Sequence, residues 1–328
     1  MKNIYAINLQ LFADMNTNTT LSEKLSVENK TFYDKTLLVE AQPLLVHDQF
    51  AQKRPIPKNG GKKIEFRKFA SLPKATTPLT EGVTPDGKSL EVTAIEAEVA
   101  QYGDYIVYSD VLDLTAIDPV VTEAVKVIGN QAGLTLDTIT RDVLHSGTNV
   151  FYCSKADGTE VNDRDELDNT CRLTAKEVKK VAAFLKKVNA PKIDGSYVAI
   201  IHPFVAFDLQ NDPEWIEAHK YTTPDNIYEG ELGKIGGVRF VESSEAKVYE
   251  GGVFGCIFLG ANAYGVTEIE GGGLRTIIKQ LGSSGVADAL DQRASIGWKA
   301  IKTAEILLDP YLIRVECKSE LGAKAEAN

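Results

Sequence analysis

The sequence contains few cysteines, and they form no metal-binding or redox motif. Only four cysteines occur among the 328 residues. No Cys-x-x-Cys pair is present to begin a zinc site or a redox couple. We therefore expect four free thiols of the cytosolic kind and predict neither a metal nor a cofactor. The four are Cys153, Cys171, Cys256 and Cys317.

Long apolar runs are also missing. No window approaches the ~18 consecutive apolar residues of a membrane-spanning helix, so we expect no membrane crossing and no membrane partner. The first residues, "MKNIYAINLQLFAD", are mildly apolar, but Asn8 and Gln10 interrupt them and no small-x-small cleavage site follows. This segment is more typical of a flexible or partner-bound arm than of a secretory signal, and Met15 is an alternative start.

Positive charge is scarce relative to negative charge. The chain has 36 basic and 46 acidic residues, which gives a formal charge of −10 and a pI of about 5.1. This is the wrong sign for a protein whose main task is to bind nucleic-acid phosphates. Hydrophobic residues make up 43% of the chain, enough to bury a substantial core.

The stretch from Ile200 to His219 concentrates polar chemistry and raises the hypothesis of a metal-dependent hydrolase. Two of the four histidines and four carboxylates lie within it. However, His202 precedes a proline, which favours extended backbone at a strand end. Asp212 and Glu214 flank Pro213 in the pattern of a helix start. His219 follows Glu214 by five residues, unlike the spacing of a zinc helix. We therefore predict no catalytic residue and no metal ligand, and keep the hydrolase as an alternative.

Three other segments resemble binding motifs without matching them. The acidic "ADGTEVNDRDELDNT" lacks the glycine and glutamate that a calcium loop needs at its sixth and twelfth positions, so we expect a solvated loop. The glycines of "GELGKIGG" precede a strand pattern, not a helix, which predicts a turn and not a phosphate loop. The charges of "KKIEFRK" alternate along a predicted strand, which favours a solvated or intersubunit face over nucleic-acid binding.

The first third of the chain predicts an arm and a hairpin. Residues 14–30 are polar, whereas 30–51 carry apolar side chains that must contact something, in two short helical pieces divided by Pro43. Alternating residues around 62–69 and 92–99 then predict a long β-hairpin that turns at "TPDG". An isolated hairpin of this kind is only marginally stable in water, so we expect it to project and to be stabilised by another subunit.

A long helix is predicted next, from a cap at Asp118 to about Ser146, roughly 40 Å in length. Its buried stripe is expected to contain Val121, Ala124, Ile128, Ala132, Leu136, Ile139 and Val143.

The rest of the chain mixes helix and strand patterns. Residues 147–170 are predicted to form a loop or a short hairpin. Thr174 and Glu177 form a capping-box pattern that opens a second helix, with Val188 among its inward residues and Pro191 at its end. Short strands alternate with glycine-rich turns in the remainder. The pattern predicts an α+β fold.

The order of these parts resembles the major capsid (coat) protein of tailed bacteriophages and prophages, in particular the N4-like phage coat proteins. The resemblance lies in "NLQLFA", "KTFYDKTLL", "KRPIPKNGGKKIEFRKF", "LTEGVTPDG", "YSDVLDLTAIDP", "LTLDTITRDVL" and "DALDQRASIGWKA". It implies the Hong Kong phage capsid fold. The implied parts are an N-terminal arm (1–55), an extended β loop (56–110), a peripheral domain (111–194) with a spine helix (118–146), an axial domain (195–270), and peripheral strands with a C-terminal tail (271–328).

The resemblance also implies a function. Such proteins are not enzymes; they self-assemble into pentamers and hexamers of an icosahedral shell, which encloses double-stranded DNA without sequence-specific binding. Implied partners are other copies of the chain and portal, scaffold or decoration proteins. The implied location is the virion capsid, assembled in the bacterial host cytoplasm. An encapsulin-like compartment shell is the alternative within the same fold.

Two groups of residues are expected at subunit interfaces. The first lies on the extended loop and the second on a late strand that carries an arginine and a tryptophan, residue types enriched at interface hot spots. For Trp298, filling the core of its own domain is an equally good alternative. The expected interface residues are Ile64, Phe66, Arg67, Asp291, Gln292, Arg293 and Trp298.

Overall fold

A computed structural model describes residues 45–70, 72–79, 81–84, 86–115, 120–219, 233–283 and 288–328, together with Lys35, Leu37 and Val39. Helices and strands are mixed, as the α+β prediction requires. In chain order they are β1 (Gln52–Lys53), β2 (Lys63–Phe69), β3 (Val92–Glu98), β4 (Ala100–Ser109), α2 (Asp110–Thr115), α3 (Val120–His145), β5 (Val150–Tyr152), η3 (Arg164–Glu166), α4 (Ala175–Lys187), β6 (Tyr197–Ile201), α5 (Pro203–Gln210), α6 (Pro213–His219), β7 (Lys234–Ile235), β8 (Val238–Glu242), β9 (Val248–Tyr249), β10 (Val253–Leu259), β11 (Tyr264–Thr267), β12 (Arg275–Lys279), β13 (Arg293–Ile306), η5 (Asp309–Tyr311), β14 (Leu312–Lys318) and η6 (Gly322–Lys324).

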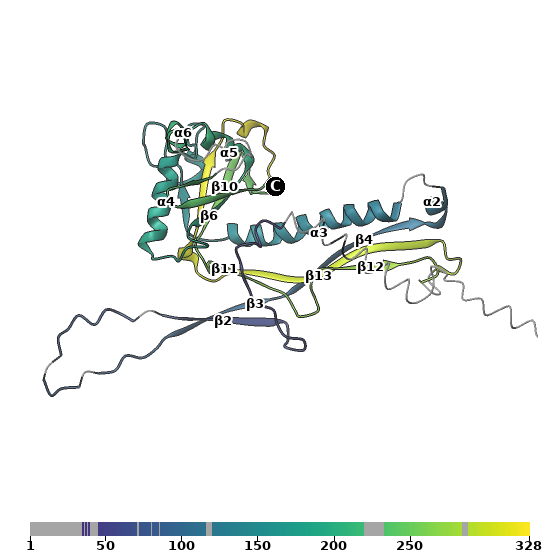
Figure 1. Ribbon diagram of the computed structural model, residues 1–328, viewed down its shortest axis with the longest axis horizontal. Helices are drawn as coiled ribbons and strands as arrows, with labels where there is room; N and C mark the ends of the chain where they lie inside the picture. The colour runs from purple at the N-terminus through teal and green to yellow at the C-terminus, as the bar shows by residue number, and fades with distance from the viewer. Residues whose placement is uncertain are drawn as a thin grey trace, which may run out of the picture.

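The subunit is elongated and has three visible parts (Figure 1). A body that contains β6, β10 and α4 to α6 lies at one end. From it, α3 runs alongside β4, β13 and β12, so that α2 lies far from the body. The third part, the β2–β3 hairpin, extends on the other side of β13 and points away from α2 (Figure 1). An elongated shape of this kind leaves much of the chain outside any single core.

The long helix packs on a five-stranded sheet whose central strand is β13. β13 pairs antiparallel with β4, β11 and β12, and β1 pairs with β11. The predicted stripe is confirmed at Ile128, Ala132 and Leu136, which are buried. Val143 is only half-buried, and the neighbouring Leu144 takes the buried position at the end of the helix. The predicted cap at Asp118 lies outside the described residues.

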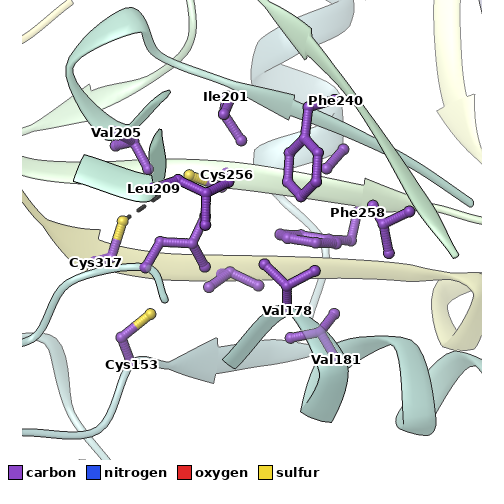
Figure 2. Close-up of a cluster of buried hydrophobic side chains, with 14 of the residues drawn as sticks. Cys153, Val178, Val181, Ile201, Val205, Leu209, Phe240, Cys256, Phe258 and Cys317 are labelled. Atoms are coloured by element: carbon purple, nitrogen blue, oxygen red, sulfur yellow. Dashed lines mark hydrogen bonds between the residues drawn. The ribbon is translucent and has the colours of Figure 1, made fainter. Parts of the chain in front are cut away.

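The body at the other end is built on a seven-stranded sheet in the order β5-β14-β10-β6-β8-β7, with β9 also paired to β10. Every residue of β6 and β10 is buried. Ile200, Ile257 and Leu259 on one face of the two strands cluster with Leu144 of α3, whereas the other face packs with apolar residues of α4 and α5. Figure 2 shows Cys153, Cys256 and Cys317 among these apolar side chains, with the last two sulfur atoms 4.0 Å apart. A hydrogen bond to Cys317 and burial raise the pKa of the Cys153 and Cys256 thiols. All four cysteines are free, as expected.

The helix predicted after residue 174 is confirmed as α4, and Thr174 is its cap. The Thr174 hydroxyl accepts a hydrogen bond from the Glu177 backbone N–H at 3.4 Å. The prediction for Val188 is wrong, since its side chain is exposed. The helix ends at Lys187 and Asn189 takes a positive φ of 53°, so the chain turns out of the helix at Val188 and away from the core stripe.

Residues 147–170 were expected to form either a loop or a short local hairpin, and they do not form the hairpin. Residues Val150–Tyr152 form β5, which pairs in parallel with β14, more than 150 positions along the chain. A parallel partner cannot be reached by a tight turn, so local sequence patterns do not reveal it. β14 in turn pairs with β10 in the body, whereas the expected division groups it with the strands after residue 271.

The extended loop expected at 56–110 contains two different structures. β2 and β3 form a separate two-stranded sheet, with Phe66 opposite Ile95. β4 leaves that hairpin and pairs along its whole length with β13. The change of partner occurs near Val99, which is buried. Pro85 of the expected turn and Pro43 of the expected arm lie outside the described residues.

A buried polar cluster, here called the polar junction, joins the segment before β1 to α3 and β13. It consists of His47, Asp48, Asp137, Thr140 and Lys302. Asp137 accepts hydrogen bonds from the His47 backbone N–H at 2.8 Å and from its ring Nδ1 at 2.6 Å. Asp48 accepts from the Thr140 hydroxyl at 2.6 Å and from the Lys302 ammonium at 2.5 Å.

The lysine reaches the polar junction because of strand periodicity. Alternate residues of β13 point toward α3, and Lys302 occupies one of these positions after Trp298 and Ala300. Burial lowers the Lys302 pKa, while the Asp48 carboxylate favours its charged form. Lys302 also donates to the Leu136 carbonyl at 2.8 Å. Lys302 thus links β13 to Asp48 and to α3, while Asp137 and Thr140 bind α3 to residues 47–48.

Replacement of Asp137 by alanine should destabilise the subunit by roughly 3 kcal/mol, because two buried donors of His47 lose their acceptor. The matched control is Glu123→Ala on the same helix, whose side chain is 56% exposed and pairs with the exposed Lys126 at 2.9 Å. That pair should contribute less than ~1 kcal/mol. Urea unfolding of isolated subunits measures both, and equal losses would contradict the assigned role of the polar junction.

Candidate assembly surfaces

The histidine- and acid-rich stretch from Ile200 to His219 forms the predicted strand end and the predicted helix start at Pro213, and a further helix, α5, begins directly after His202. His202 follows β6 and caps α5, its ring Nδ1 accepting from the Phe204 N–H at 3.1 Å. Burial lowers the His202 pKa, which favours the neutral ring that this bond requires. The side chain of His219 lies outside the described residues. Among the residues that are described, no group of three metal-ligating side chains is close enough to hold an ion.

Asp212 has a larger structural role than the sequence indicates. One carboxylate oxygen accepts from the Glu214 N–H at 2.9 Å and so caps α6. The other accepts from the Ala175 N–H at 2.7 Å at the start of α4. One side chain therefore fixes two helix termini together, where the helix dipoles favour negative charge. Both carboxylate oxygens of Asp212 thus have a structural role.

The other two candidate loops also have backbone roles. In the acidic loop, Asp168 accepts from the side chain and backbone of Thr170, which lowers the Asp168 pKa to about 2. Arg164 of the same loop forms two bonds of 2.6 Å with the buried Glu316 of β14 and so fixes the loop to the body. Gly236 and Gly237 have positive φ angles and form the turn between β7 and β8, which confirms the predicted turn.

The hairpin exposes apolar side chains on its strands and on the loop that joins them. This group, here called the hairpin surface, has no cover within the described part of the chain. Leu79 is 76% exposed, for example. The members are Phe69, Leu72, Leu79, Val83, Leu90 and Val92. Exposed apolar groups gathered on one projecting segment favour association with another protein.

A second apolar group, here called the tip surface, lies around α2 at the far end of the subunit. Sequence reasoning missed it, because three apolar residues in a six-residue helix give no clear periodicity. Its members are Tyr105, Val107, Val111, Leu112, Leu114 and Leu290, all exposed. The hairpin and the tip point in opposite directions (Figure 1). The two surfaces are therefore too far apart to cover each other within one subunit.

The expected interface residues of the hairpin lie at its base, not at its end. Phe66 is buried, and its ring packs so close to Gly265 of β11 that a Cβ there would lie 3.1 Å from it. Ile64 is half-buried opposite Ala97. Arg67 is exposed and pairs with Glu65 at 3.1 Å. Phe66 thus anchors the hairpin to its own subunit, whereas Arg67 faces outward.

The expected interface residues of the late strand divide in the same way. Asp291 and Gln292 are exposed, and the Gln292 carbonyl accepts from the Asp110 N–H at 3.1 Å, beside the tip surface. The Arg293 side chain is 61% exposed and lies 4.0 Å from Asp288. Trp298 is only 3% exposed, packs beneath α3, and donates to Gln131 at 3.3 Å. Trp298 therefore fills the core of its own domain, which was the alternative to an interface role.

Comparisons with known proteins identify the fold through solved structures and not through sequence. No protein-family model matches the chain, and no curated protein matches its sequence. Among solved structures, the cyanophage Pam1 capsid matches with a TM-score of 0.66 at 12% identity, covering 85% of this chain and 92% of the other. The cyanophage P-SCSP1u capsid matches with a TM-score of 0.65 at 14% identity, covering 83% and 87%.

A more distant match is the virus-like particle from Pyrococcus furiosus, with a TM-score of 0.50 at 11% identity, covering 88% of this chain and 99% of the other. Identities this low show the fold alone. The chain has the capsid fold of tailed phages over most of its length, which confirms the predicted fold class.

The two residue types of the late strand should respond differently to truncation. Trp298→Ala should cost roughly 3–5 kcal/mol of folding free energy, because a large side chain leaves the core. Arg293→Ala should change folding by less than ~0.5 kcal/mol and reduce association between copies. Chemical unfolding and sedimentation velocity separate the two effects. Unchanged association of Arg293→Ala would exclude its interface role.

Proposed function

We propose that this chain is the major subunit of an icosahedral capsid of a tailed bacteriophage or prophage, and that its copies associate into pentamers and hexamers. The observation that carries the proposal is the fold match over 83–85% of the chain to two phage capsids. Its two exposed apolar surfaces at opposite ends suit a subunit that has neighbours on several sides.

The hairpin explains why association should be obligatory. Two strands without further partners are marginally stable in water, and their free edges can pair with another chain. In the proposed shell, a neighbouring subunit covers the hairpin surface and the tip surface. Ordering of the hairpin and association then become partly one event, so assembly stabilises each subunit.

Within the proposed capsid fold, we assign the axial domain to the body and the peripheral domain to α3 with its sheet. We place β14 in the axial domain because it pairs with β10. The N4-like coat proteins remain our suggestion for the nearest family. We further propose that the shell encloses double-stranded DNA without binding specific sequences, which is consistent with the formal charge of −10. Portal, scaffold or decoration proteins would act with it, and assembly would take place in the host cytoplasm.

A cargo compartment of the encapsulin kind is the second candidate, and the match to a virus-like particle favours it. That match has a lower TM-score, 0.50 against 0.66 for a phage capsid, so we rank it second. A co-purifying cargo enzyme would distinguish the two. The hydrolase alternative has little support, since His202 and Asp212 both serve as helix caps.

Expression of the full chain alone should yield capsomers, sheets or shells in negative-stain electron microscopy. The double variant Leu79→Ser/Leu90→Ser should lower their yield severalfold while the subunits stay folded, because it removes apolar contacts without touching a core. The matched control is Lys74→Ser/Lys88→Ser, which changes two exposed polar side chains of the same loop.

Two outcomes would count against the proposal. If the wild type gives only small discrete oligomers, the shell function fails. If the leucine and lysine variants assemble equally well, the hairpin surface is not an interface.

A further inference from the structure

The body has an open sheet edge at β5. Among the described strands, β5 pairs only with β14, so it is the outer strand of the seven-stranded sheet. The Asn149 carbonyl accepts from Arg314, and the Cys153 N–H donates to Glu316, each at 3.0 Å. Since backbone groups alternate along a strand, those of Val150 and Tyr152 point away from β14. Their N–H and C=O groups are therefore available to a further strand.

This edge borders a groove of about 560 Å³ between β5, α4 and residues 160–162. Its walls are largely apolar. The rings of Phe151 and Phe184 lie 6.0 Å apart, and Phe184 remains 47% exposed although it faces this groove. Other lining residues are Val150, Tyr152, Val161 and Ala183. The groove therefore combines a free backbone ladder with apolar side-chain contacts.

The three charged side chains that line the groove are of both signs. Lys180 lies on its rim and is already bonded to Glu177 at 2.8 Å and to Ser154 at 3.2 Å. Lys187 and Glu160 also line it and have opposite signs. A strongly charged occupant such as nucleic acid is therefore not favoured. The chemistry suits an extended, uncharged peptide that pairs with the edge and inserts alternate apolar side chains.

The chain itself contains such a peptide in residues 3–13, which lie outside the described structure. "INLQL" at residues 7–11 alternates apolar Ile7, Leu9 and Leu11 with uncharged Asn8 and Gln10, and no charged residue occurs from 3 to 13. The hairpin loop, which also exposes apolar side chains, contains Pro73, Pro78 and Pro85. Proline lacks the N–H that an added strand needs, so the loop fits less well.

The segment has enough chain to reach another subunit. Leu37 is buried against α3 beside Val125 and Ile128. The 26 positions from Leu11 to Leu37 can span up to roughly 85 Å, about twice the length of α3, which is ~39 Å. An arm that leaves one copy and adds to the sheet of the next is a heterologous contact, as repeating assemblies require.

We propose that the β5–α4 groove receives the Ile7–Leu11 segment of a second copy of this chain as an added β-strand. The contact closes the open edge of the body and exchanges a strand between copies. It does not depend on the chain forming a capsid, since any oligomer of the chain could use it.

The test places a photo-crosslinking phenylalanine analogue at Phe184 in the full-length protein. Equal amounts of normal and ¹⁵N-labelled protein are mixed and assembled before irradiation, and the adducts are mapped by mass spectrometry. Adducts to residues 3–13 with mixed isotopes support the proposal. The control position is Phe207 on α5, which has a similar exposure of 45% and does not line the groove.

A backbone variant tests the pairing itself. Tyr152→Pro removes an N–H that faces the groove and spares the ladder to β14, so the adduct should fall about tenfold. Tyr152→Ala removes the ring but keeps the N–H, and should retain most of the adduct. Circular dichroism and thermal unfolding verify that both variants fold.

The proposal would be overturned by adducts of Phe184 that map to other segments, by adducts within single copies only, or by equal labelling from Phe207. Because the readout is a contact between copies in solution, it can fail while shells still form. Equally, it can succeed in oligomers that never close into a shell, so the two proposals are tested separately.

Discussion

The polar junction is the interaction on which the elongated form of this subunit depends. Three segments far apart in sequence meet there: residues 47–48, the middle of α3, and β13. Each charged group has a partner, so their burial is tolerated, but only in one arrangement of the three segments. Apolar packing alone would allow α3 to slide on the sheet. Its register is fixed by the bond from Lys302 to the Leu136 carbonyl, and by the bonds of Thr140 with Asp48 and of Asp137 with His47.

That fixed register accounts for the surfaces at both ends. α3 and β13 extend beyond the body, so the tip surface is held far from the main core (Figure 1). Phe66 anchors the hairpin base against β11, and the hairpin surface projects the opposite way. The subunit thus has a core that it completes by itself and a periphery that it does not. Association between copies follows from this division, because exposed apolar area and free strand edges are covered only by neighbours.

Much of this arrangement follows from local sequence, and the exceptions have a common cause. Helix caps at Thr174 and Asp212 depend on neighbouring residues, so their patterns identify them. The cap at His202 was not predicted, because the residue before the proline indicated only a strand end. The inward stripe of α3 is likewise a local periodicity. What local patterns do not contain is pairing over long distances. The parallel strand β5, the change of partner by β4, and the buried Lys302 each depend on residues more than 150 positions away.

The candidate interface residues show the same limit. The sequence indicated that interface residues lie on the hairpin and on the late strand, but it did not show which of these side chains face solvent and which face the core. Arg67 and Arg293 face outward, whereas Phe66 and Trp298 contribute to the subunit's own packing. The tip surface was not predicted at all, since its apolar residues lie in a helix too short to show a period. A three-dimensional arrangement was needed to make these assignments.

Hydrogen–deuterium exchange of the isolated and the assembled protein tests the central claim most directly, namely that the core is complete in one subunit and the periphery is completed by neighbours. The account predicts slow exchange of α3 and β10 in both states, and slow exchange of β2 and β3 only after assembly. If the β2–β3 hairpin exchanged as slowly in isolated subunits as in the assembled protein, the account would be contradicted.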